Sequence, residues 1–179
     1  MPLEQEVEEV SSTLERLVST PTVTGMEREA EAILRELLEP HVDEFRVTGW
    51  ANYVGTINPG GERSVMLAAH IDQIGFIVRS IDEKGYLRFA PVGGWDPKVP
   101  YGWRVRVLTG RGPVLGVIGT VPPHLLEREE REKAPKFEKL AIDVGAESRE
   151  EAEEMGMRVG DLSLIHISEP TRPRLISYA

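Results

Sequence analysis

The fold is decided by residues 64–72, Ser-Val-Met-Leu-Ala-Ala-His-Ile-Asp, where an apolar run ends directly in a histidine and a carboxylate. A run that is apolar throughout predicts a central strand covered on both faces, so we expect residues 64–69 to be such a strand. Ligands bind at the carboxyl ends of strands in open α/β sheets. His70 therefore stands where a functional site is expected.

Two helices are expected upstream of this strand. Residues 4–18 show helical spacing of apolar residues and predict an amphipathic helix with one buried stripe, formed by Val7, Val10, Leu14 and Leu17. Residues 24–27, Thr-Gly-Met-Glu, have the pattern of a capping box that opens a second helix, which Pro40 ends. Helices followed by strands favour an α/β layer.

Short strands flank the central run on both sides, separated by turns that contain glycine. The alternation of apolar residues predicts strands at 45–47, 53–57, 75–81, 86–91, 104–108 and 114–120. The part after Asp72 has the texture of a small antiparallel barrel or sandwich. Ser148 opens another capping box for a short helix that Gly156 closes.

The composition excludes several classes of protein. The formal net charge of -9 disfavours a nucleic-acid partner, and the absence of cysteine excludes disulfides and thiolate metal sites. Any metal must then be held by histidine and carboxylates. Because no apolar run approaches the roughly 20 residues of a bilayer span and the first residues are acidic, we expect a soluble cytoplasmic protein without a membrane partner.

His70 and Asp72 are the candidate site residues. Side chains two apart on an extended segment point the same way, so Asp72 can fix the imidazole tautomer and leave the other ring nitrogen free for a metal. The spacing alone fits an ordinary hydrogen-bonded pair at a strand end even better. Loop, interface or core roles suit His124, Trp95 and Trp103 better than metal or substrate roles, and the charged residues 127–133 suit a solvated loop or short helix.

The stretch at residues 66–76 resembles the first metal motif of the tetrahedral aminopeptidases, metallopeptidase family forty-two, which includes the glutamyl aminopeptidases. Further stretches at 85–96, 121–124 and 142–148 are similar to the same family, in the same order. The resemblance implies an α/β fold class. Residues 1–72 would be the N-terminal part of a zinc-peptidase α/β catalytic domain, and residues 73–161 an inserted small β-barrel-like dimerisation domain.

The resemblance also implies function. The parent enzyme would carry two divalent ions, zinc or cobalt, remove N-terminal residues from short peptides, and assemble from dimers into a homo-oligomeric dodecamer. His70 carries over as a ligand of one metal and Asp72 as the carboxylate that supports it. The other ligands and the general-base glutamate follow the insert in the family, so we expect this chain to be inactive and to bind zinc weakly at most.

Two other interpretations stand beside this one. The chain alone could act as a non-catalytic, self-associating β-domain. Glycoside hydrolysis is less favoured, because it needs two carboxylates flanking a sugar bond and no such pair is singled out.

The tail differs from the rest of the chain. Residues 162–172 match an in-frame translation of a transposase-based sequencing adaptor, and residues 176–179 fit its continuation. We therefore expect residues 162–179 to be a non-native, adaptor-like tail. Its prolines and lack of periodicity predict a disordered or poorly packed end.

Overall fold

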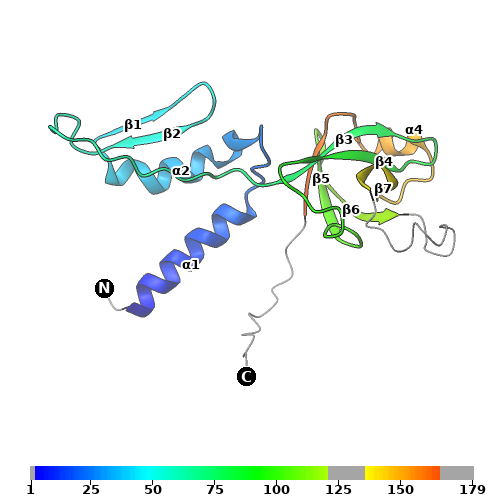
Figure 1. Cartoon of the computed structure of the whole chain (residues 1–179), viewed down its shortest axis with the longest axis horizontal. Coiled ribbons are helices and arrows are strands. Elements are labelled where there is room, and N and C mark those ends of the chain that lie inside the picture. The colour runs from blue at the N-terminus through cyan, green and yellow to red at the C-terminus, as the bar shows by residue number, and fades with distance from the viewer. Residues whose placement is uncertain (1–2, 121–135, 166–179) are drawn as a thin grey trace. The chain divides into compact units, whose positions relative to one another are not determined.

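The computed structural model describes residues 3–120 and 136–165, and the chain divides into two compact units, Met1–Gln73 and Ile74–Ala179 (Figure 1). The mixed α/β class expected from the sequence is confirmed. The family-like stretch 121–124 with His124, and the charged residues 127–133, lie outside the described residues.

The first unit begins with helix α1, Leu3–Ser19, as the apolar spacing predicts. The prediction of a buried stripe is wrong, since none of the helix residues is buried. Val7, Val10 and Leu14 are all more than half exposed. The stripe stays open because no described element packs against that face.

The second helix is also present, followed by a hairpin. It consists of the 3-10 turn η1, Glu27–Ala30, the helix α2, Glu31–Leu38, and the 3-10 turn η2, Glu39–His41. The hairpin pairs β1, Glu44–Val47, with β2, Tyr53–Thr56, in antiparallel register. The apolar core of this unit is small, and its buried members are Val23, Ala30, Leu34 and Ala51.

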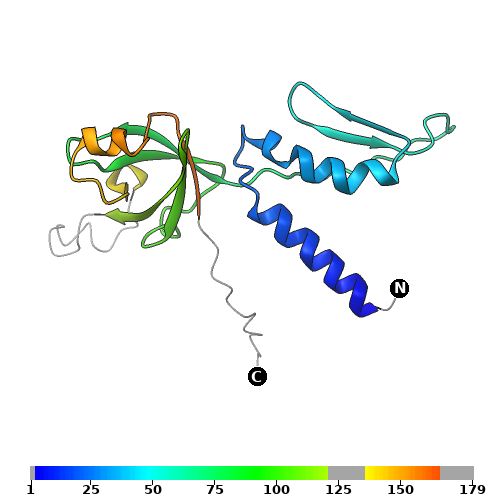
Figure 2. The same cartoon turned by 180° about the vertical axis from the view of Figure 1, so that it is seen from behind.

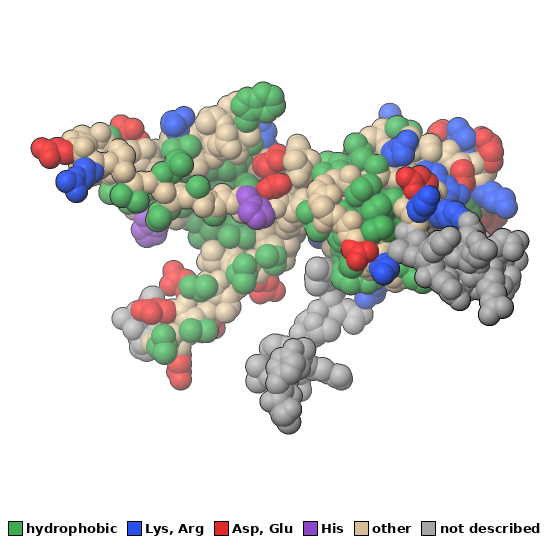
Figure 3. Space-filling view, in the orientation of Figure 1, with side chains coloured by type: hydrophobic (Ala, Val, Ile, Leu, Met, Phe, Trp, Pro, Cys, Tyr) green, Lys and Arg blue, Asp and Glu red, His purple; other side chains and the backbone are tan. Residues whose placement is uncertain are grey.

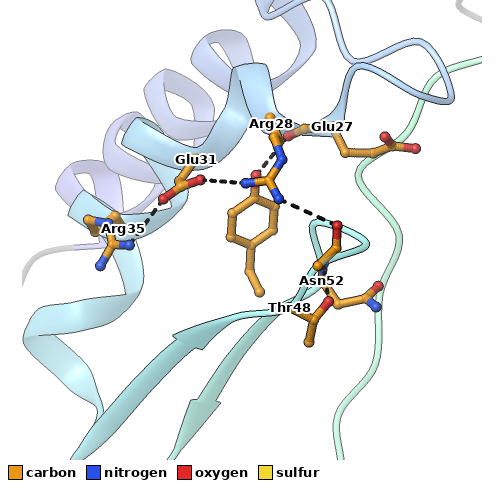
Figure 4. Close-up of polar contacts among 8 residues, drawn as sticks. Glu27, Arg28, Glu31, Arg35, Thr48 and Asn52 are labelled. Carbon is orange, nitrogen blue, oxygen red and sulfur yellow. Dashed lines mark hydrogen bonds and ion pairs between the residues drawn. The ribbon is translucent and has the colours of Figure 1, made fainter.

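Polar contacts fasten the start of this helix to the hairpin (Figure 4). The Tyr53 hydroxyl donates to the Glu27 carbonyl at 2.9 Å, and the Arg28 guanidinium donates to the Gly49 carbonyl at 3.4 Å. Arg28 also lies 3.7 Å from the Glu31 carboxylate. Burial raises the pKa of Tyr53, with a further contribution from the Glu31 charge. The helix and the hairpin therefore share polar contacts as well as a core.

The central strand expected at residues 64–69 is absent, and this prediction is wrong for the described chain. Val65, Met66 and Leu67 are 89%, 87% and 95% exposed. A strand needs neighbours for its backbone N–H and C=O groups, and the described residues supply none along this run.

The second unit is a closed antiparallel barrel of six strands in the order β3-β4-β7-β6-β5-β8 (Figure 2). Its strands are β3, Gly75–Ile81; β4, Leu87–Val92; β5, Arg104–Thr109; β6, Gly112–Thr120; β7, Leu140–Asp143; and β8, Leu162–Ile165. The first four of these are strands that the sequence predicts. The 3-10 turn η4, Phe137–Lys139, precedes β7.

Aromatic and aliphatic side chains fill the barrel. The Phe76 ring lies 4.8 Å from the Phe89 ring and 4.7 Å from the Trp95 ring, and the Trp95 indole N–H donates to the Gly75 carbonyl. Helix α4, Arg149–Glu154, adds the buried Ala152 to this core. Its expected cap is confirmed, because the Ser148 hydroxyl accepts from the Glu151 N–H and Gly156 follows at a φ of +102°.

Strand β8 consists of the first four residues of the expected adaptor-like tail. It pairs with both β3 and β5 and so closes the barrel. Ser163 and Leu164 are buried within it. The prediction of a disordered or poorly packed end is therefore wrong for Leu162–Ile165, since β5 pairs with all four residues and β3 with Leu162 and Ser163.

Candidate metal site

The backbone that carries the candidate residues is fixed by the segment that follows α1. The Thr22 hydroxyl donates to the Ile71 carbonyl at 2.7 Å, and the Gln73 N–H donates to the Thr22 carbonyl at 2.8 Å. Val23 and Gln73 form a parallel bridge. Because Thr22 and Val23 are almost fully buried, they hold residues 71–73 in an extended conformation.

This extended conformation brings the side chains of His70 and Asp72 together. His70 Nδ1 lies 3.2 Å from Asp72 Oδ1 and 3.1 Å from the Asp72 carbonyl oxygen. With Nδ1 donating to these oxygens, Nε2 is left as the free acceptor nitrogen. The His70 side chain is 86% exposed, so that nitrogen is open to a ligand.

Thr24 contacts Asp72 in the structure, whereas its sequence context predicts a helix cap. Its hydroxyl donates to Asp72 Oδ2 at 2.9 Å, which leaves Oδ1 to face the imidazole. The prediction of a capping box at residues 24–27 is therefore wrong, because the Thr24 side chain bonds to Asp72 and Met26 is the residue at the N-cap. The Glu27 carboxylate accepts from the Gly25 N–H instead of the Thr24 N–H that a capping box requires, and η1 has no side-chain cap.

The pair supplies only part of a metal site. Within residues 3–120 and 136–165, no three His, Cys, Asp or Glu side chains are grouped where they could hold a metal ion. A structural zinc ion needs about four ligands and a catalytic one about three from the protein. His70 has the chemistry of a zinc or cobalt ligand and Asp72 that of its supporting carboxylate, but the described residues offer no third ligand.

The other candidates have different positions. Trp95 packs against the barrel core, and Trp103 is 41% exposed on the barrel surface. None of the helices in the described part of the chain is both long and apolar enough to cross a bilayer.

The chain thus consists of an α/β unit that ends in a His-x-Asp pair and a unit that forms a closed barrel. The chain belongs to the M42 glutamyl aminopeptidase family, whose model matches residues 52–172. This confirms the resemblance of the motif stretches.

Individual relatives agree with this assignment. The lysyl aminopeptidase of Pyrococcus furiosus is 37% identical over 152 residues, which cover 83% of this chain and 43% of that protein. The crystal structure of a TET aminopeptidase from a marine sediment archaeon of the Thaumarchaeota is 38% identical, with a TM-score of 0.84 over 89% of this chain and 45% of that one.

A third relative is the TET1 peptidase of Pyrococcus horikoshii, described as able to assemble into a tetrahedron or a large octahedral shell. It is 33% identical, with a TM-score of 0.75 over 87% of this chain and 46% of its own. The chain thus spans less than half the length of each of these relatives.

Proposed function

We propose that this chain is the N-terminal part of a cytoplasmic, metal-dependent aminopeptidase that removes N-terminal residues from short peptides. In this proposal His70 is a ligand of one of two divalent ions, zinc or cobalt, and Asp72 orients it. The observation that carries the proposal is the contact of His70 Nδ1 with Asp72, which leaves an exposed Nε2.

Each residue of the pair has a defined task. Asp72 keeps the proton on Nδ1, so that Nε2 presents its lone pair outward. Thr24 limits the rotation of the Asp72 carboxylate by donating to its second oxygen. When bound, divalent ions in such an enzyme polarise the peptide carbonyl and lower the pKa of a coordinated water.

The chain alone is expected to lack hydrolytic activity, because the described residues offer too few ligands. Zinc and cobalt titrations, followed calorimetrically, test the site. We expect weak binding that is lost in His70→Ala and retained in His41→Ala, which removes an exposed histidine of the same unit. Equal binding by both variants would remove His70 from the site.

Aminopeptidase activity is tested separately, by hydrolysis of the p-nitroanilides of lysine and glutamate. We expect the chain and its His70→Ala variant to show the same background rate. A rate for the unchanged chain clearly above that of His70→Ala would contradict the proposed inactivity.

We further propose that residues 1–72 begin the catalytic domain and that residues 73–161 form the inserted dimerisation domain. Dimers of the parent would assemble further, by analogy with the TET1 relative. A second candidate function is that of a non-catalytic, self-associating β-domain, which is supported by the exposed side chains of Trp103, Leu115 and Val117 on the barrel. Light scattering coupled to size-exclusion chromatography tests it, since a monomer at micromolar concentration would reject self-association.

The adaptor origin of residues 162–179 remains part of the proposal. Long-read sequencing of the source locus across the Asp161 codon tests it. A reading frame that continues into further acidic and histidine metal motifs would support the proposal, and a genomic Leu162 onward would overturn it.

A further inference from the structure

One cavity of the second unit brings together charges of both signs. The face of this unit seen in Figure 3 carries basic and acidic side chains next to one another. A cavity of about 630 Å³ lies between the end of β3, the helix α4 and residues 157–159. Its polar lining residues are Ser80, Arg149, Glu153 and Arg158. Binding sites for small molecules have volumes of about 300–1,000 Å³, so this cavity has the size of a ligand site.

The acidic group of the cavity is Glu153, which lies one helical turn after Arg149 on α4. Residues four apart on a helix are neighbours, but an arginine that precedes a glutamate is the less favourable order for an ion pair. The Arg149 guanidinium donates to the Glu83 carboxylate instead, at 2.7 Å. Glu153 is exposed, and the described residues supply no ion-pair partner for its carboxylate.

The basic groups of the cavity are two arginines. Arg149 Nε is buried and has no acceptor within the described residues, so Glu83 uses only part of the hydrogen-bonding capacity of this guanidinium. The main-chain N–H of Arg158 donates to the Asp161 carboxylate, while its side chain is exposed without an ion-pair partner in the described part of the chain. Guanidinium groups bind carboxylates through paired N–H donors. The two arginines can therefore receive a carboxylate.

The cavity also has an apolar wall. Ile81 and Met157 are buried at its base, and Val159 is 66% exposed. An aliphatic group placed against Val159 would remove apolar surface from water, which favours binding. The Ser80 hydroxyl adds a group that can donate or accept. A ligand that matches this wall carries an anion, a cation and an aliphatic group.

We propose that this cavity binds a zwitterion with an aliphatic side chain, namely a free amino acid or a short peptide. The ligand carboxylate lies against Arg149 and Arg158, its ammonium group against Glu153, and its side chain against Val159. A simple anion fits less well, because Glu153 repels it. Amino acids and shortened peptides are also what the proposed aminopeptidase would release, but this inference goes beyond the proposed function and does not rest on it.

The charge of the whole chain makes such binding informative. With a formal net charge of -9, the chain repels free anions on average. Attraction of a carboxylate is therefore not expected from the overall field of the protein. Binding at this place would report on the local arrangement of Arg149, Glu153 and Arg158.

A titration with leucine, followed by the amide NMR shifts of the isotope-labelled chain, tests the proposal. We expect a dissociation constant on the order of 1 mM, as is usual for a ligand of so few atoms. The shifts should gather at residues 80–81 and 149–159. A parallel titration with leucyl-leucine distinguishes the two sources, since the ligand that binds more tightly identifies an amino-acid or a peptide site.

Two blocked forms of leucine test the zwitterion. N-acetyl-leucine lacks the ammonium group, and leucine methyl ester lacks the carboxylate. Each loses one charge-assisted contact and should bind about tenfold more weakly than leucine.

Two variants assign the charges to residues. Glu153→Gln should weaken leucine about tenfold and leave N-acetyl-leucine unchanged, because that ligand has no ammonium group to lose. Arg158→Gln should weaken leucine about tenfold and leave the methyl ester unchanged. Glu150→Gln and Arg79→Gln alter exposed charges of α4 and β3 that do not line this cavity, and should change no affinity. All four positions are exposed, so the variants should keep the remaining NMR spectrum.

The outcomes decide the proposal. Saturable shifts at the cavity, with this dependence on ligand charge and on Glu153 and Arg158, would support it. Absence of saturable shifts, equal binding of leucine and its blocked forms, or a Glu153→Gln variant that weakens leucine and N-acetyl-leucine alike would overturn it. None of these measurements depends on zinc or on hydrolysis, so they leave the proposed function to its own tests.

Discussion

Ser163 is the residue that fits its surroundings least well. Its cross-strand partners on either side, Phe76 and Val107, are fully buried, so Ser163 points into the barrel core. Its hydroxyl makes no hydrogen bond within the described residues. A shift of one residue in β8 would turn Leu162 and Leu164 inward instead. The hydrogen-bonded pairing with β3 and β5 therefore sets the register of β8, although it turns a serine and not the two leucines toward the core.

Replacing Ser163 with alanine should therefore stabilise the barrel. A buried hydroxyl without a partner costs about 1–3 kcal/mol, so Ser163→Ala should raise the thermal midpoint by a few degrees. Ser80→Ala, which removes an exposed hydroxyl from β3, is the matched control and should change little. Thermal melts followed by circular dichroism measure both, and a lower midpoint for Ser163→Ala would show that the hydroxyl is satisfied in solution.

At the scale of elements, the turn between β3 and β4 depends on one carboxylate. Asp82 Oδ1 accepts from the N–H groups of Lys84 and Tyr86, both at 3.1 Å, and Oδ2 accepts from the Arg88 guanidinium at 2.9 Å. Burial by itself would raise the pKa of Asp82, but these donors together outweigh it and hold the pKa below its usual value. The ionised form of Asp82 therefore stabilises the hairpin.

Removing this charge should make stability less dependent on pH. Folding lowers the pKa of Asp82. The stabilisation by the Asp82 carboxylate is therefore fully present above the unfolded-state pKa of about 3.9, and it is lost as the pH falls through the lower folded-state pKa. We expect Asp82→Asn to be less stable than the unchanged chain at pH 7, with the difference shrinking toward pH 3. Urea titrations at both pH values measure it, with Asp96→Asn, in a loop after β4, as the control. A difference independent of pH would contradict this role.

Gly85 in the same turn is required for two separate reasons. Its φ is +82°, and a Cβ placed there would lie 2.8 Å from the Ala146 carbonyl and 2.9 Å from that of Ser148. Gly145 has nearly the same φ, +81°, but open space around it.

Alanine substitutions at these two glycines should separate strain from collision. Gly145→Ala should cost about 1–2 kcal/mol for the left-handed backbone alone. Gly85→Ala should cost about 1–3 kcal/mol more, because the displaced atoms belong to the backbone. Chemical denaturation measures the free energy of unfolding of both variants. Equal losses of stability would mean that the backbone at Ala146 and Ser148 moves aside without cost when Gly85 is replaced.

At the scale of the whole molecule, the two units differ in what they bury. The barrel core joins buried residues of β3 to β7 with the helix α4, and Ile165 of β8 packs against it. Its fully buried members include Phe76, Leu87, Ile118 and Met157. Among the described residues of the first unit, the buried apolar side chains are few and mostly small: Val23, Ala30, Leu34 and Ala51. Stability follows buried apolar area, so the units should not unfold together.

Hydrogen exchange should reveal this difference directly. We expect the amides of β3, β5 and β6 to exchange slowest, and those of α1, β1 and β2 to exchange at least about tenfold faster, because little core protects them. Mass spectrometry of peptic peptides over time measures the rates. Equal protection of both units would show that the chain unfolds cooperatively as one body.

Local patterns account for what the sequence predicts correctly. The period of α1, the alternation in β3 to β6 and the Ser148 cap each depend on residues close together in the chain. The apolar run at residues 64–69 predicts a strand, but a strand also needs distant neighbours, which the described chain does not supply. The contact of Thr24 with Asp72 spans 48 residues, and no local signal distinguishes it from a helix cap.

The exposed run at residues 65–69 also bears on how long the polypeptide would survive. Proteases bind their substrates as extended strands, and a chymotrypsin-like enzyme prefers an apolar residue before the cut bond, such as Met66 or Leu67. Cleavage of so exposed a segment requires no prior unfolding. A nick there would release the barrel with its ladder of hydrogen bonds whole, while α1 and the hairpin would be separated from His70 and degraded.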